Sequence, residues 1–268
     1  MAEIIDFADV PYLVELLNYL PIDATDKKDV NTYLRNITDS ILVNYGNEQY
    51  QFAYFGFHLL YMTYIYFSVR KISLILPERY ADAVVFAKSY HGQKLDFNNL
   101  ESTFDYSLVA EKELPNILKI IGLDSGQIGK IGWLVDNRNE MAHANGRFAI
   151  LTEEAFQTST NGLLESVRNI HRRMDVQIRI WFKVFLLRYC DGEFDEYDEV
   201  VDIITEQMIQ GFNLSIQELL VCNEMSIRQL VSEKPDFKDS LNKFKITLKV
   251  YSEKQGYTLE NLFSQGEE

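Results

Sequence analysis

The sequence predicts an all-α protein, with a helical bundle over residues 1–190 and a smaller helical C-terminal region over residues 191–268. Three observations support this fold class. A hydrophobic fraction of 47% across 268 residues is enough to build a core. Only 13 Gly and 5 Pro interrupt the chain, which favours long helices over many short strands. Apolar residues also recur at helical spacing in most segments.

Capping and breaking signals place the ends of these helices. Asp9, Ser125 and Thr152 are the expected N-caps of the helices that follow them. Pro77 ends the third helix, and residues 158–162 are an expected break in the long helix before residue 190. The expected helices span residues 9–20, 26–44, 49–76, 78–90, 111–121, 125–143, 152–190 and 237–255.

One segment has to be weighed as a membrane span, because residues 52–69 contain no formal charge. Lipid would leave the polar groups of His58, Thr63 and several tyrosines in its middle without partners. We therefore expect a buried central helix without membrane insertion, and membrane association is the alternative. Within such a helix His58 is expected to be a satisfied core histidine.

The charge distribution limits how this chain can contact nucleic acid. A formal net charge of -14 disfavours tight, sequence-blind binding to phosphates, although a local basic groove is compatible with it. The segment from Asp191 to Glu206 holds eight acids and no base. It marks a soft domain boundary, and it is either a solvated face with a connecting loop or an acidic interaction element.

The sequence shows neither the residue spacing of a metal site nor the start of a secretory signal. Cys190 and Cys222 and four dispersed histidines have no metal-ligand or disulfide spacing, so we expect neither a metal nor another cofactor. Residues 1–5 lack the basic start of a secretory signal, and acids interrupt the apolar run that would follow. The expected location is the cytoplasm.

The segment over residues 125–146 carries the candidate chemistry. Five polar residues follow one another over 136–140, and they cannot all face solvent because one helical turn takes 3.6 residues. Arg138 and His143 lie about 140° apart around a regular helix, as neighbours across a groove. Asn139 and His143 share a face, so Asn139 could orient the imidazole.

The run Arg138-Asn139-Glu140-Met141-Ala142-His143 resembles the Arg-x4-His motif of the HEPN superfamily, in which a small polar residue such as Asn commonly follows the Arg. The helical setting of the motif is also similar. This resemblance covers six residues. It implies a HEPN-like bundle that forms a homodimer and brings two copies of the motif to one cleft.

The resemblance further implies a metal-independent endoribonuclease. His143 would move the proton of a ribose 2'-hydroxyl or of the leaving 5'-oxygen. Arg138 would hold the scissile phosphate and stabilise the transition state. Asn139 would orient these groups, and Glu140 would modulate their charge. Attack by the 2'-oxygen leaves a cyclic phosphate, a product that DNA cannot form.

A toxin or an antiviral defence effector is the biological setting that the resemblance implies. The implied partners are an RNA substrate, a second copy of the chain and an antitoxin or regulatory protein. Toxins of this type that are paired with nucleotidyltransferase antitoxins often carry a modified Tyr two residues after the His. Position 145 here is Asn145, which puts that mode of silencing in doubt.

A basic strip on the helix before residue 190 is the predicted RNA-binding surface. Its cations follow one stripe of the helix, and they either guide an RNA backbone or pair with the acids of residues 191–206. His171, on the same helix, is a second histidine candidate. The strip consists of Arg168, Arg172, Arg179 and Lys183.

A catalytically silent module that dimerises or docks a partner is the alternative function. In that case Arg138 pairs with a neighbouring acid such as Asp136 or Glu140, and His143 only caps the end of its helix. The acidic balance of the chain mildly favours this alternative.

Overall fold

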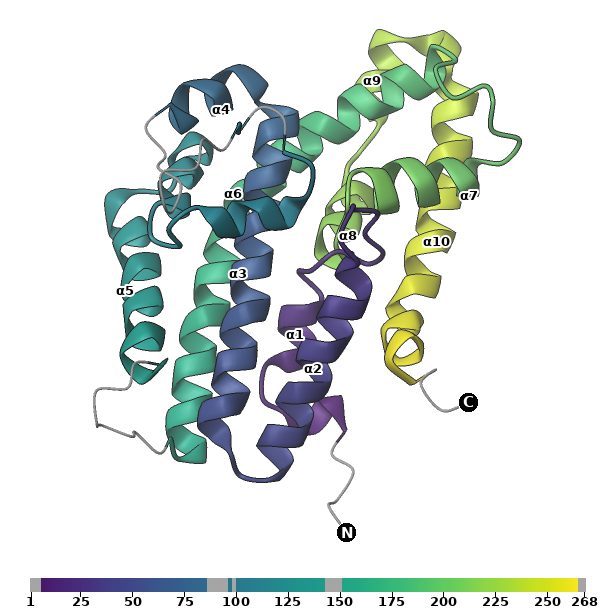
Figure 1. The fold of residues 1–268 in the computed structure, drawn as a ribbon. Helices are drawn as coiled ribbons and strands as arrows, with labels where there is room; N and C mark the ends of the chain where they lie inside the picture. Colours follow the sequence, from purple (N-terminus) through teal and green to yellow (C-terminus); the bar gives the residue numbers. More distant parts are fainter. Residues whose placement is uncertain (1–5, 86–95, 98–99, 143–150, 265–268) are drawn as a thin grey trace. The chain divides into compact units, whose positions relative to one another are not determined.

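The computed structural model describes residues 6–85, 96–97, 100–142 and 151–264 (Figure 1). All regular elements in these ranges are helical, and the β-type pairing they contain is an isolated bridge between Pro21 and Ser215. The predicted all-α class is therefore confirmed. The chain divides into two compact units, the first formed by residues 1–20 and 26–174 and the second by residues 21–25 and 175–268.

This division falls inside the longest helix, α6 (Glu153–Cys190), whereas the sequence placed a boundary at its C-terminal end. The first 22 residues of α6, up to Met174, belong to the first unit, and the rest belong to the second. The other elements of the first unit are η1 (Phe7–Asp9), α1 (Leu13–Leu17), α2 (Val30–Gly46), α3 (Tyr50–Ile75), α4 (Pro77–Val84), η3 (Thr103–Leu108), η4 (Leu114–Ile121) and α5 (Ser125–Ala142).

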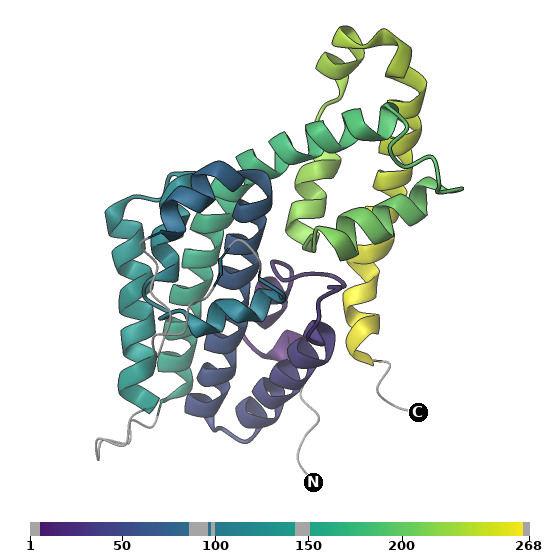
Figure 2. The same cartoon turned by 45° about the horizontal axis from the view of Figure 1, so that its top comes forward.

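Helix α3 forms the centre of the first unit, as expected from its apolar composition. It packs against α1, α2, α4, η3 and η4, and it also runs beside α6 in both views (Figures 1 and 2). The Tyr61 hydroxyl hydrogen-bonds Ser166 at 2.9 Å, and the Tyr64 hydroxyl donates to the Val167 carbonyl at 3.3 Å. Partners within the protein thus satisfy polar groups that lipid would leave unpaired. No helix of the described residues has the length and apolar character needed to cross a membrane.

Several helix ends differ from those predicted. Asp9 lies in a short 3-10 turn, and α1 starts only after Tyr12, which adopts a left-handed backbone conformation with φ of 67°. Asp124 caps α5 in place of Ser125, because its side chain accepts from the Gln127 amide at 2.8 Å. The prediction at Thr152 is confirmed, since its hydroxyl accepts from the Ala155 amide at 3.2 Å.

The expected break over residues 158–162 is wrong, because α6 runs through it without interruption. The Thr160 hydroxyl donates a hydrogen bond to the Phe156 carbonyl at 2.9 Å, so this polar side chain has a partner within the helix. A Cβ on Gly162 would lie 3.7 Å from Leu134 on α5, which is ordinary packing distance. The turn-forming residues of this segment therefore do not end the helix.

The second unit has its own aromatic core. Trp181 on α6 stacks on Phe212 with ring centroids 3.9 Å apart, and Phe244 packs 4.9 Å from Tyr189. Lys245 donates to the Cys222 carbonyl at the end of α8, at 2.8 Å. The elements after α6 are α7 (Val200–Ile203), a π-helical stretch η5 (Ile204–Gly211), α8 (Ile216–Glu224), α9 (Arg228–Glu233), η6 (Pro235–Phe237) and α10 (Lys238–Ser264).

Candidate functional site

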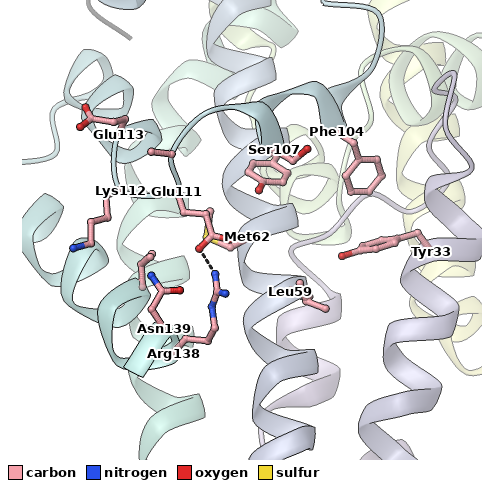
Figure 3. A pocket seen from close by; sticks show the side chains of 13 residues that line it. Tyr33, Leu59, Met62, Phe104, Ser107, Glu111, Lys112, Glu113, Arg138 and Asn139 are labelled. Atoms are coloured by element: carbon pink, nitrogen blue, oxygen red, sulfur yellow. Dashed lines mark hydrogen bonds and ion pairs between the residues drawn. The ribbon is translucent and has the colours of Figure 1, made fainter. Parts of the chain in front are cut away.

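The motif helix α5 presents two residues of its polar run to a cavity in the first unit. Ile131, Leu134 and Val135 are buried, and they orient the helix against the rest of the unit. With that face fixed, Arg138 and Asn139 line a cavity of about 660 Å³ (Figure 3). The prediction that some of residues 136–140 point away from bulk solvent is therefore confirmed for this pair.

The cavity has an apolar side and a polar side. α2, α3 and η3 supply most of the apolar and aromatic side, to which α5 adds Val135. The chain before η4 together with Arg138 and Asn139 of α5 supplies most of the polar side (Figure 3). The apolar and aromatic lining consists of Tyr33, Leu59, Met62, Tyr66, Phe104 and Val135. The remaining lining residues are Ser107, Ala110, Glu111, Lys112, Glu113, Arg138 and Asn139.

Arg138 forms an ion pair with Glu111 on the polar side of the cavity. Both side chains are about three-quarters buried, with 23% and 24% exposed. Burial by itself raises the pKa of the Glu111 carboxyl, but His58 and the Arg138 charge outweigh it, so the pKa is lowered. Glu111 is therefore a carboxylate at neutral pH, and it neutralises the guanidinium that the motif supplies.

His58 lies behind this pair on α3, with 1% of its surface exposed. Its Nε2 is 3.7 Å from Glu111 Oε2, beyond hydrogen-bond distance. Neither ring nitrogen has a hydrogen-bond partner among the described residues, and the same holds for Nε of Arg138. Burial lowers the pKa of His58 despite the neighbouring carboxylate, so the imidazole is neutral at pH 7. His58 is thus buried as predicted, but within the described part of the chain it is not satisfied.

A second ion pair flanks the first. Lys112 pairs with Asp136, two residues before Arg138 on α5. Glu140 is exposed and does not line the cavity. The acid that pairs with Arg138 is therefore Glu111, from a different segment, and neither Asp136 nor Glu140 takes that place.

His143 lies outside the described residues, as do Ala144, Asn145 and Gly146 of the expected helix end. The predicted relation between Arg138 and His143 therefore stays a prediction. His171, the second histidine candidate, packs edge-on against Tyr19 at 5.1 Å between ring centroids. It does not line the cavity that contains Arg138.

Each cation of the predicted strip has a hydrogen-bond or ion-pair partner, and these partners come from several segments. Arg168 makes two hydrogen bonds of 2.6 Å to Glu15, and Arg172 donates to Asn169 at 3.4 Å. Arg179 pairs with Asp175, and Lys183 lies 3.5 Å from Glu233. None of these acceptors belongs to residues 191–206. That acidic segment pairs instead with Arg188, through Glu193. The two compact units divide the strip between Arg172 and Arg179.

Glu111 and His58 are the site residues that sequence reasoning missed. Glu111 has no helical spacing to the motif, and only the packing of the chain before η4 against α5 brings it to Arg138. Groups of three or more side chains that could hold a metal do not occur among the described residues. The functional groups that meet around Arg138 are its own guanidinium, the Asn139 amide and the Glu111 carboxylate.

Comparisons with protein-family models, with curated proteins and with solved structures find nothing that matches this chain. The resemblance to the HEPN superfamily therefore rests on the six residues of the motif and on the helical setting of α5.

Proposed function

We propose that this chain is a metal-independent endoribonuclease of HEPN type that acts at the Arg138 cavity. The observation that carries the proposal is that Arg138 and Asn139, consecutive on α5, line the same cavity. Solvent reaches this polar side, because Arg138 and Glu111 each keep about a quarter of their side chains exposed. A guanidinium on a cavity wall is the group that recognises a phosphate through a planar fork of donors.

In this proposal Arg138 binds the scissile phosphate and stabilises the charge that develops on it. His143 transfers the proton of the 2'-hydroxyl or of the leaving oxygen, since an imidazole titrates near neutral pH. Asn139 orients the reacting groups, and Glu140 modulates the local charge from the exposed face of the helix. The products are a 2',3'-cyclic phosphate and a 5'-hydroxyl, formed without a metal ion.

The proposed partners follow from the same resemblance. A second copy of the chain supplies the other motif, and an antitoxin or regulatory protein controls activity in the cytoplasm. A role as a toxin or antiviral defence effector belongs to this proposal. The RNA backbone contacts the basic strip, which consists of Arg168, Arg172, Arg179 and Lys183. At each of these cations, an RNA phosphate has to displace the side chain that now accepts its hydrogen bond or ion pair.

The experiment is RNA cleavage by the purified chain in excess chelator, followed by analysis of the fragment ends. We expect cleavage with cyclic phosphate termini and no cleavage of DNA of the same sequence. Cleavage that stops in chelator, or that also cuts DNA, would contradict this mechanism.

A catalytically silent docking module is the second candidate function. The ion pairing favours it, because Glu111 already neutralises Arg138 and acids pair with most of the strip. This candidate predicts a stable dimer or complex in sedimentation experiments, together with the absence of RNA cleavage under every condition above.

A further inference from the structure

Glu111 enters the cavity from the chain between η3 and η4, 27 residues before its partner Arg138. Figure 3 shows its carboxylate directed at the guanidinium, with the neighbouring Glu113 pointing away from it. The contact joins Glu111 Oε2 to Nη2 of Arg138. Glu111 therefore meets the outer end of the guanidinium, which is the part that a phosphate in the cavity would contact.

A carboxylate and a phosphate engage a guanidinium through the same planar donors. Nε of Arg138 is buried without a partner among the described residues, so the terminal nitrogens are the donors that face the cavity. Glu111 already holds one of them. A phosphate that binds Arg138 at this end must compete with the carboxylate.

A buried imidazole lies beside the Glu111 carboxylate without a hydrogen bond to it. His58 Nε2 lies 3.7 Å from the same Oε2 atom that meets Arg138, and His58 is held in the core by α3. The carboxylate is thus placed between a buried imidazole and a guanidinium from two different helices. The ion pair to Arg138 and its partial burial position Glu111, unlike a flexible surface acid.

We propose that Glu111 is a positioning residue that acts as an internal stand-in for the RNA phosphate, holding Arg138 in place when RNA is absent and competing with phosphate for it. This inference rests on the proposed function, because it assigns Glu111 a role in that same site. It predicts tighter RNA binding with little change in turnover when the carboxylate charge is removed. A purely structural ion pair would not tighten RNA binding when broken.

The binding experiment compares Glu111→Gln with Glu113→Gln. Both variants remove one negative charge from the same wall, but only the first releases Arg138. The probe is a short mixed-sequence RNA with 2'-fluoro sugars, which cannot form a cyclic phosphate, and its binding is followed by fluorescence anisotropy over a salt series. We expect Glu111→Gln to bind about tenfold more tightly and to steepen the salt slope by about 0.7, the value for one phosphate contact on a single strand. Glu113→Gln should keep the slope of the parent protein.

Turnover gives the second half of the test, with ordinary RNA as substrate. We expect KM of Glu111→Gln to fall by about tenfold while kcat stays within about threefold of the parent protein, because bound phosphate has replaced Glu111 as the partner of Arg138 when turnover occurs. If circular dichroism shows that Glu111→Gln does not fold, Glu111→Asp replaces it in both experiments. Its carboxylate is withdrawn by one methylene, so the same shifts should appear at smaller size.

The outcomes separate this inference from the proposed function. Binding by Glu111→Gln that is unchanged or weaker than that of Glu113→Gln would overturn the role of Glu111, even if the parent protein cleaves RNA. A parent protein that cleaves no RNA would refute the ribonuclease. Tighter binding by Glu111→Gln would still support competition for Arg138 in that case.

Discussion

Two kinds of paired cation occur in this molecule, and they differ in their access to water. Arg138 pairs with Glu111 on a cavity wall, where each side chain is about a quarter exposed. Arg188 pairs with Glu193 at the end of α6, where each side chain is about half exposed. Withdrawal from water makes the partner of Arg138 necessary, since a buried charge without one is costly. The exposed pair contributes little, because water solvates both charges when they separate.

The largest expected effect concerns chemistry at the cavity. His143→Ala should lower the rate of RNA cleavage by about 10³-fold, because general acid–base catalysis typically contributes 10² to 10⁴. The measurement is single-turnover cleavage in chelator, with circular dichroism to confirm the fold. A variant that cuts RNA as fast as the parent protein would remove His143 from the site and with it the HEPN assignment.

The next effect sharpens the contrast between buried and exposed pairs. Glu111→Ala should lower the free energy of unfolding by about 2 kcal/mol, because it leaves the largely buried Arg138 without a counter-charge. Glu193→Ala is the matched control, and its cost should stay below about 0.5 kcal/mol. Urea denaturation measures both. Equal costs for the two variants would show that burial does not distinguish the pairs.

A pH effect follows from the buried imidazole behind Glu111. The pKa of His58 is lowered from 6.5 in the folded protein, so between the folded and unfolded pKa values the unfolded chain binds more protons. The free energy of unfolding should therefore rise with pH up to about 6.5, by at most about 1.4 kcal/mol per pH unit.

Denaturation at several pH values below 6.5 tests this effect, with His58→Leu as the comparison. The variant should have a flatter profile in that range. The loss of stability through Glu111 occurs at lower pH, because the pKa of this carboxyl is lowered from 4.5. An unchanged profile in His58→Leu would place the titrating group elsewhere.

The smallest expected effects lie on the basic strip. Arg179→Ala and Lys183→Ala should each change the free energy of unfolding by less than about 0.5 kcal/mol, because these pairs are more than one-third exposed. If the strip contacts RNA, each substitution should also reduce the salt slope of binding by about 0.7. A salt slope that stays unchanged would remove these residues from the RNA surface.

Most of the fold could be predicted from the sequence because it follows from local pattern. The apolar composition of residues 52–69 anticipated the buried helix α3, and Thr152 correctly marked the start of α6. Helix ends were less predictable where two candidates compete. Asp124 caps α5 although Ser125 follows it, and α6 continues through residues 158–162, where Thr160 is hydrogen-bonded within the helix.

The site was predictable only where it lies on one helix. Arg138 and Asn139, two of the predicted site residues, line one cavity, whereas their predicted relation to His143 stays a prediction. Glu111 could not be predicted as the partner of Arg138, because folding brings it there from 27 residues away. His58 was expected to be satisfied in the core, yet the described residues leave its nitrogens without partners, and no local pattern signals that.

The most direct test of the account compares two arginines that acids already hold. Arg138→Ala and Arg188→Ala each remove a guanidinium from an ion pair, one on the cavity wall and one on the exposed end of α6. In single-turnover cleavage of RNA in chelator, we expect Arg138→Ala to lose about 10³-fold in rate and Arg188→Ala to stay within about threefold of the parent protein. Equal rates for the two variants would contradict the assignment of the cavity as the place where RNA is cleaved.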